Sequence, residues 1–238
     1  MIPKIIHYCW FGKGSKSEQV QKCIDSWKIH LPGYVIKEWN EQNFDVNSVL
    51  YVKEAYTAKK YAFVSDYVRL YALYNEGGIY MDTDIEVIKN FDDLLINVSF
   101  IGFEDIDCIG SGVMGAKKGE KWLYDNMEYY HNRHFRLAFG ILDVTTNVRI
   151  ITKYMQKKSL VLNNKYQRID SRITIYPKDY FCPKSWKTQE ICCTDNTYCI
   201  HHFECSWGKT KTWEEKVRIY LHKIKIFFLI IINGVVKK

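Results

Sequence analysis

The chain has 238 residues, of which 47% are hydrophobic and 26% are charged. This composition excludes a disordered or fibrous protein and predicts a globular domain that buries a substantial core. The net charge of +7 comes mainly from residues 209–238, and basic residues gathered at one end of the chain argue against a nucleic-acid-binding groove.

The first part of the chain predicts alternating strands and helices. Residues 4–10 predict a buried strand, residues 17–31 a helix that stops at Pro32-Gly33, and residues 34–39 a second strand. Residues 52–75 predict the longest helix, and Gly77-Gly78 predicts its C-cap. This succession predicts an α/β sheet domain.

The pattern of short elements continues downstream. Residues 79–81 predict a strand that ends at Asp82-Thr-Asp84, and residues 85–88 continue extended. Further strands are predicted at 98–103, 111–116, 173–176 and 198–202, and further helices at 121–135 and 144–157.

Asp82 and Asp84 are the first candidates for chemistry. Side chains at i and i+2 of an extended segment point the same way, so the two carboxylates repel each other unless a cation lies between them. Oxygen ligands favour Mg²⁺ or Mn²⁺, and diphosphate oxygens fill the open positions of such an ion. A DxD motif alone is a weak signal, because Asp-rich turns are common.

Asp66 and Arg69 add to this signal from upstream. They are spaced i, i+3 on the predicted helix and therefore share a face. Apolar residues surround them, so the pair is expected to be partly buried, and a buried Asp-Arg pair can hold sugar hydroxyls.

Three segments carry a resemblance to one family. Residues 61–84, YAFVSDYVRLYALYNEGGIYMDTD, closely resemble the DXD-containing sugar-binding region of glycosyltransferases. This is the family of the yeast-type initiating mannosyltransferases and of bacterial capsule and lipopolysaccharide sugar transferases, and more distantly of the clostridial glucosylating toxins. Residues 2–12, IPKIIHYCWFG, resemble its first strand, and residues 201–207, HHFECSW, resemble its C-terminal motif.

The resemblance implies a GT-A fold, a Rossmann-like mixed sheet flanked by helices, and a metal-dependent transfer that retains the anomeric configuration. In such a site Trp10 stacks on the nucleobase, Asp66 and Arg69 bind hydroxyls of the donor sugar, and Ser65 and Tyr80 belong to the same pocket. The resemblance further implies that the acceptor hydroxyl attacks from the front face and is deprotonated by the leaving phosphate. The segments 99–115 and 140–147 are expected to form the acceptor side.

The resemblance also implies the metal site. Asp84 ligates the ion directly, and Asp82 contacts the ribose and the metal largely through water. His202 or Ser206 completes the metal shell, and Trp207 lies near the β-phosphate and the glycosidic oxygen. Glu204-Cys205 replaces the small residues usual before Ser-Trp in bacterial members, so the third ligand stays open between His202, Glu204 and Ser206.

The predicted function is transfer of a hexose from a nucleotide-diphosphate sugar to a glycan or lipid-linked acceptor in capsule, lipopolysaccharide or exopolysaccharide synthesis. UDP is favoured over GDP by the likeness to the bacterial branch, and no nucleic acid partner is expected. The alternatives are a metal-dependent phosphodiesterase or nucleotide-sugar hydrolase, and a non-catalytic nucleotide-sugar-binding module. A binding module has no need of a metal-held leaving group, which argues against the last.

Two domains are predicted, a glycosyltransferase domain over residues 1–208 and a basic C-terminal tail over residues 209–238. In the tail, seven consecutive apolar residues, 226–232, are flanked by lysines. They are too few for a membrane span, and they suit either a peripheral anchor on an anionic leaflet or a helix packed on the domain. A cytoplasmic protein is expected, with the inner face of the plasma membrane as a further site.

Overall fold

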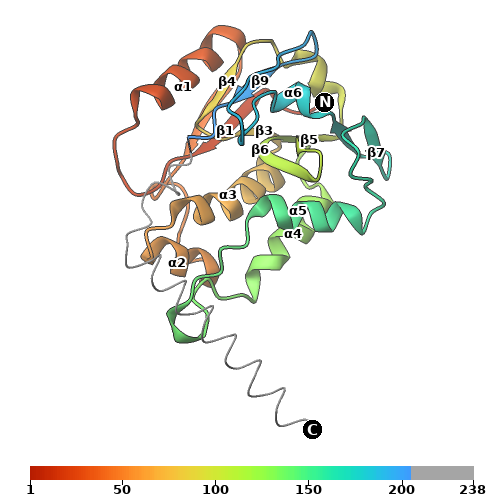
Figure 1. Cartoon of the computed structure of the whole chain (residues 1–238). Coiled ribbons are helices and arrows are strands. Elements are labelled where there is room, and N and C mark those ends of the chain that lie inside the picture. The colour runs from red at the N-terminus through yellow and green to blue at the C-terminus, as the bar shows by residue number, and fades with distance from the viewer. Residues whose placement is uncertain (205–238) are drawn as a thin grey trace. The chain divides into compact units, whose positions relative to one another are not determined.

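A seven-stranded mixed sheet forms the centre of the structure, a computed structural model that describes residues 1–204 (Figure 1). The strand order is β2-β1-β3-β6-β5-β8-β7. The strands are β1 (Ile5–Cys9), β2 (Val35–Trp39), β3 (Gly78–Met81), β5 (Ser99–Asp105), β6 (Cys108–Ala116), β7 (Gln167–Ile169) and β8 (Ile173–Tyr176). The predicted α/β class is confirmed.

The direction of the strands divides the sheet. β1 pairs in parallel with both β2 and β3, whereas β6 is antiparallel to both β3 and β5. β5 and β8 are again parallel, and β7 is antiparallel to β8. Since β1 and β3 are parallel neighbours, the residues that follow them meet at one edge of the sheet, the edge at which α/β sheets bind ligands.

Helices cover both faces of this sheet (Figure 1). α2 (Leu50–Thr57), α3 (Tyr61–Glu76), α4 (Lys121–His131) and α5 (Asn147–Gln156) lie on one face. The other face carries α1 (Glu18–His30), the short α6 (Lys178–Phe181) and a two-stranded sheet of β4 (Ile85–Val87) and β9 (Cys199–His201). Each layer buries its own apolar cluster against the central sheet, so burial of apolar area holds all three layers together.

The small β4–β9 sheet is attached to α1 by side-chain hydrogen bonds. The indole nitrogen of Trp27 donates to the carbonyl oxygen of Ile85 at 2.6 Å, and the backbone nitrogen of Val87 donates to Ser26 Oγ at 2.9 Å. Trp27 is fully buried. These contacts fix β4, and through its antiparallel pairing they fix β9.

The single helix predicted over residues 52–75 is wrong, because two helices, α2 and α3, cover this stretch. Lys59 has a φ of 56°, and the backbone nitrogen of Lys60 donates to the carbonyl oxygen of Ala55 at 3.0 Å. This is the left-handed cap that usually needs glycine. The sequence has no Gly or Pro there to signal the break. The predicted C-cap at Gly77 is confirmed, with a φ of 69°.

The remaining predicted elements agree with the structure to within a few residues. The sequence did not predict β7, α6 or the short 3-10 helices η1 (Asp92–Ile96) and η2 (Ala138–Gly140). None of the helices within residues 1–204 is long and apolar enough to cross a membrane. The predicted tail over residues 209–238 lies outside the described residues.

Candidate functional site

The DxD motif occupies the turn between β3 and β4, at the edge where β1 also ends. The backbone nitrogen of Asp82 donates to the carbonyl oxygen of Gly112. The backbone nitrogen of Ile85 donates to the carbonyl oxygen of Asp82 at 3.1 Å, which closes the turn. The expectation that Asp82 and Asp84 share one side of an extended strand is therefore wrong. The carboxylates converge because the chain turns between them.

His201 joins these two carboxylates. One ligand atom each from Asp82, Asp84 and His201 lies within 4.8 Å of the other two, and His201 Nε2 is 3.4 Å from Asp84 Oδ1. Ligands of an octahedral ion at about 2.1 Å lie roughly 3 to 4.2 Å apart, so small side-chain shifts would bring the three atoms into ligation. Two carboxylates and an imidazole fit Mn²⁺ better than Mg²⁺, which prefers oxygen alone.

The structure brings His201, and not the expected His202, to the carboxylates. In the antiparallel pair of β4 and β9, His201 lies opposite Ile85. Successive residues of a strand point to opposite faces, and His202 accordingly turns away, with its Nε2 2.7 Å from Glu86 Oε2. The metal-binding group that the described residues form does not include Glu204. Ser206 and Trp207 lie outside the described residues.

The surroundings of His201 orient its ring. Burial lowers the pKa of His201, but Asp84 and a hydrogen bond with the thiol of Cys182 outweigh it and raise the pKa well above 6.5. The two carboxylates thus draw positive charge to this position. A ring held on both sides loses little freedom when one nitrogen binds a ligand.

Arg69 links the cluster to α3. The predicted ion pair is confirmed, with Arg69 Nη2 3.2 Å from Asp66 Oδ1, and the same nitrogen is 3.2 Å from Asp82 Oδ1. The guanidinium lies 4.6 Å from the ring centroid of Tyr80, whose hydroxyl donates to Asp82 Oδ1 at 2.9 Å. Arg69 Nη1 also donates to the carbonyl oxygen of Ser111 at 2.7 Å. Arg69 thereby sets the position of the first Asp of the motif.

Asp66 is buried beneath this arginine. Burial raises its pKa to about 6, although the charge of Arg69 works in the opposite direction. Its Oδ2 accepts from the backbone nitrogen of Asn147 at 3.2 Å, and Asn147 Nδ2 donates to the Asp66 carbonyl oxygen at 2.7 Å. Asp66 therefore joins α3 to the N-terminus of α5, a contact that sequence spacing did not show.

Trp10 and Ser65, the other residues expected at the donor, are held by local contacts. Trp10 follows β1 and is partly exposed, and its indole nitrogen donates to the carbonyl oxygen of Gly14 at 2.7 Å. This bond orients the ring, and Lys16 Nζ lies over the ring at 5.3 Å from its centroid. The carbonyl oxygen of Ser65 accepts a hydrogen bond from Arg69 Nε at 3.2 Å. The hydroxyl group of Ser65 donates to the backbone carbonyl oxygen of Tyr61.

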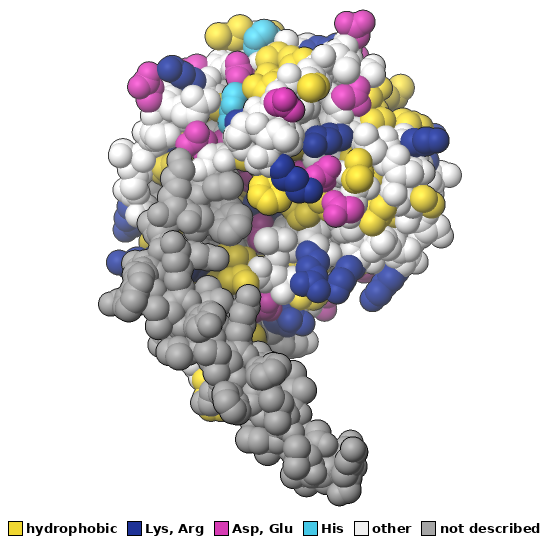
Figure 2. Space-filling view, in the orientation of Figure 1, with side chains coloured by type: hydrophobic (Ala, Val, Ile, Leu, Met, Phe, Trp, Pro, Cys, Tyr) yellow, Lys and Arg dark blue, Asp and Glu magenta, His cyan; other side chains and the backbone are white. Residues whose placement is uncertain are grey.

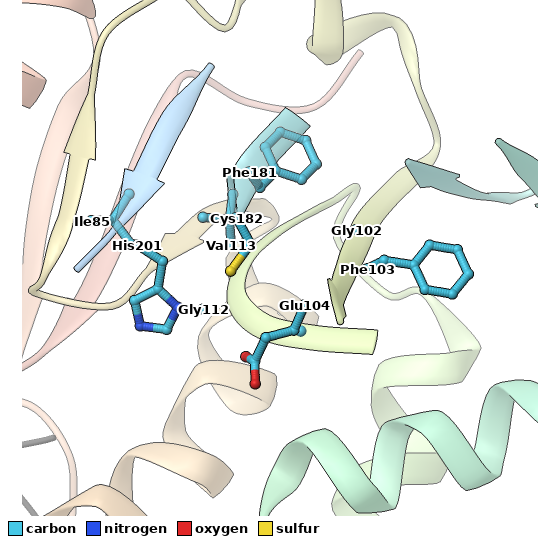
Figure 3. A pocket seen from close by; sticks show the side chains of 10 residues that line it. Ile85, Gly102, Phe103, Glu104, Gly112, Val113, Phe181, Cys182 and His201 are labelled. Carbon is cyan, nitrogen blue, oxygen red and sulfur yellow. The ribbon is translucent and has the colours of Figure 1, made fainter. Parts of the chain in front are cut away.

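A small recess adjoins the cluster on the side of β9 and α6 (Figure 3). Its volume of about 20 Å³ is room for roughly one water molecule or one hydroxyl group. His201, Cys182, Gly112 and Glu104 are among the residues that line it. Glu104 and Gly112 belong to the segment 99–115 that was expected on the acceptor side, whereas no sequence pattern indicated a role for Cys182.

Part of the chain is similar to known glycosyltransferases. Residues 17–101 match the model of the glycosyltransferase sugar-binding region containing the DXD motif. Inositol phosphoceramide mannosyltransferase 3 of Schizosaccharomyces pombe is 30% identical over 150 residues, which are 60% of this chain and 41% of that protein. The chain thus spans about two fifths of this relative's length.

Among solved structures, the PaToxG glycosyltransferase matches with a TM-score of 0.50 and 18% identity, over 66% of this chain and 68% of that chain. At this identity the likeness concerns the fold alone. It agrees with the mixed sheet flanked by helices and confirms the expected GT-A architecture.

Proposed function

Because residues 17–101 form a DXD-containing glycosyltransferase sugar-binding region within a GT-A fold, we propose that this protein transfers a hexose from a nucleotide-diphosphate sugar to a saccharide acceptor. One observation carries the proposal. Asp82, Asp84 and His201 converge at the carboxyl edge of the sheet, and Arg69 bridges the same Asp82 to the buried Asp66.

Asp82, Asp84 and His201 are the residues proposed to hold the divalent cation, with Mn²⁺ preferred because one donor is an imidazole. When bound, such an ion neutralises the charge that builds up on the leaving diphosphate without a proton transfer. Ser206 and Trp207 remain proposals from the resemblance, Ser206 as a further ligand and Trp207 as a donor to the β-phosphate.

The donor is proposed to lie between β1 and α3. Trp10 follows β1 at the edge where the DxD turn follows β3, which suits a nucleobase stacked on the indole and a diphosphate beside the carboxylates. Asp66 and Arg69 face the cluster from α3, and they are proposed to hold hydroxyls of the donor sugar. UDP is the proposed nucleotide, on the likeness to bacterial members of the family.

The transfer is proposed to retain the anomeric configuration. The acceptor hydroxyl attacks the anomeric carbon on the face that the diphosphate leaves, and the leaving phosphate oxygen takes its proton. Arg69 and Tyr80 keep Asp82 in one orientation throughout, so little reorganisation accompanies the charge movement. The support for retention is the family resemblance.

The acceptor is proposed to be a glycan or lipid-linked saccharide of capsule, lipopolysaccharide or exopolysaccharide synthesis. The sequence of the tail, with its apolar run and flanking lysines, supports a cytoplasmic enzyme that works at the inner face of the plasma membrane.

The test is release of nucleoside diphosphate by the full-length protein from UDP-glucose, UDP-galactose, UDP-N-acetylglucosamine and GDP-mannose, with Mn²⁺ or with EDTA. We expect the protein to turn over at least one of these donors. This turnover should require Mn²⁺ and should increase when methyl glycosides are added. Asp84→Asn should abolish it without unfolding the protein. Binding of donor and Mn²⁺ with no turnover would favour a binding module. Turnover that no acceptor stimulates would favour a nucleotide-sugar hydrolase.

A further inference from the structure

We propose that Glu104 binds a hydroxyl group of the acceptor saccharide, in the recess that lies next to His201 and across β6 from Arg69. This inference rests on the proposed transferase function and deepens it. It names a residue that recognises the acceptor and the chemical group that it recognises.

Glu104 is a half-buried carboxylate beside the candidate cation site. It lies near the end of β5 and lines the recess, and no residue within 1–204 gives it a hydrogen bond or an ion pair. Burial raises the pKa of its carboxyl group. A poorly solvated carboxylate without a partner costs stability, and such groups are commonly retained because they contact a ligand.

Two glycines leave the space beside Glu104 open. Gly110 and Gly112 are two residues apart on β6 and therefore face the same side. A Cβ atom at Gly110 would lie 3.4 Å from Glu104 Oε2, and one at Gly112 would lie 3.2 Å from Asp82 Oδ2 and 3.3 Å from His201 Cε1. The two glycines thus let Glu104, Asp82 and His201 lie close over β6, and the recess that Glu104 and His201 line has room for about one hydroxyl group.

The recess lies on the opposite side of β6 from the proposed donor residues. Arg69 contacts Ser111, the residue between the two glycines, with Nη1 3.3 Å from Ser111 Oγ. Neighbouring residues of a strand point to opposite faces, so Arg69 lies on the side of Ser111 and Glu104 on the side of Gly110. With the donor sugar held at Asp66 and Arg69, the Glu104 side is left for the acceptor.

The chemistry of the recess suits a neutral, hydroxyl-bearing ligand. Figure 3 shows Glu104 and His201 extending from β5 and β9 on either side of it, with Cys182 between them. A carboxylate accepts hydrogen bonds and repels anions, so it is unsuited to the donor diphosphate. A sugar hydroxyl donates one hydrogen bond to Glu104 while its oxygen points toward the cation site.

The test compares Glu104→Ala and Glu104→Gln with Asp195→Asn, an exposed acidic residue outside the segments expected on the acceptor side, as control. The donor is whichever sugar nucleotide the wild type turns over, and the acceptors are methyl α- and β-glycosides of glucose, galactose and mannose. For Glu104→Ala we expect kcat/KM for the best acceptor to fall roughly 10- to 100-fold, as for loss of a hydrogen bond to a charged group. Glu104→Gln keeps one acceptor oxygen and should lose less, and Asp195→Asn should match the wild type.

Two further readouts separate acceptor binding from other roles. Mn²⁺ affinity and acceptor-independent donor hydrolysis should stay within about twofold in both Glu104 variants, and the melting temperature of Glu104→Gln should equal or exceed that of the wild type, because an unpaired carboxylate is removed. Equal acceptor KM and kcat in wild type and Glu104→Ala, or a parallel loss of Mn²⁺ binding, overturns the role of Glu104 alone. A wild type that releases no nucleoside diphosphate refutes the proposed function itself.

Discussion

The guanidinium of Arg69 lies between the carboxylates of Asp66 and Asp82, with Nη2 3.2 Å from an oxygen of each. One of these acids is a helical neighbour and the other belongs to the DxD turn, so a single cation joins α3 to the turn after β3. Both ends are poorly exposed, and the pair is little screened by solvent.

We predict that Arg69→Met destabilises the protein strongly, because it leaves the buried Asp66 and the partly buried Asp82 without their counter-charge. Breaking a buried ion pair by removing one partner costs about 3–5 kcal/mol, and urea unfolding measures this loss. In the double variant Asp66→Asn/Arg69→Met, part of the loss should be recovered. A loss below about 1 kcal/mol in Arg69→Met would show that the pair is open to solvent.

The two adjacent histidines provide a matched pair of variants. We predict that His201→Ala weakens Mn²⁺ binding roughly 10- to 100-fold, as for removal of a ligand or its support, measured by titration calorimetry. His202→Ala should change it by less than about twofold, because His202 faces Glu86. The reverse result would mean that β9 pairs with β4 one residue out of the register seen here.

Gly112 has a steric role that a methyl group tests. In Gly112→Ala the new Cβ meets Asp82 Oδ2 at 3.2 Å and His201 Cε1 at 3.3 Å, so both groups must move. Overpacking of this kind costs about 1–3 kcal/mol, and we expect Mn²⁺ affinity to fall about tenfold. Gly14→Ala, where no atom lies within 4 Å, is the control. An unchanged Mn²⁺ affinity in Gly112→Ala would show that the side chains of the site can accommodate the added methyl group.

The buried His7, which lies outside the candidate site, should make the stability of the protein depend on pH. The indole nitrogen of Trp39 donates to His7 Nδ1 at 3.0 Å, so Nε2 carries the proton and donates to the Gly77 carbonyl oxygen at 2.7 Å. Burial lowers the pKa of His7 below 6.5, and the folded state therefore favours the neutral ring.

Below pH 6.5 His7 binds a proton in the unfolded chain, whereas in the folded protein it stays neutral to a lower pH. The contribution of His7 is therefore complete above pH 6.5 and is lost as the pH falls below that value, by at most about 1.4 kcal/mol per pH unit. Urea unfolding from pH 7.5 to 5 should show this decline, and the decline should be shallower in His7→Gln. Identical slopes in both proteins would exclude His7 as its origin.

The tail over residues 209–238 lies outside the described residues, and membrane binding by this tail is a prediction from its sequence. We predict that deletion of residues 222–238 releases the protein from anionic vesicles and leaves transfer to a soluble acceptor intact, because the apolar run and its lysines are removed together. Sedimentation with phosphatidylserine vesicles measures binding, with phosphatidylcholine vesicles as control. Unaltered sedimentation of the shortened protein would eliminate the anchor.

Local features of the fold and site could be predicted from the sequence. Asp66 and Arg69 were expected to pair because helical periodicity alone brings i and i+3 together. The cap at Gly77 followed from the freedom of glycine at positive φ. The break at Lys59 was not predicted, because Lys59 adopts a positive φ, which is expected of glycine and not of lysine.

The sequence by itself determined the α/β class, the Asp66–Arg69 pair and the two acids after the strand, because each depends on neighbours within a few residues. Only the tertiary structure decided that His201 rather than His202 reaches those acids, that Arg69 also binds Asp82, and that Glu104 faces a recess floored by Gly110 and Gly112. These relationships depend on the register between segments far apart in the chain. Packing of β4 on α1 and of β9 on β4 sets that register, and a shift of one residue would reverse every side chain.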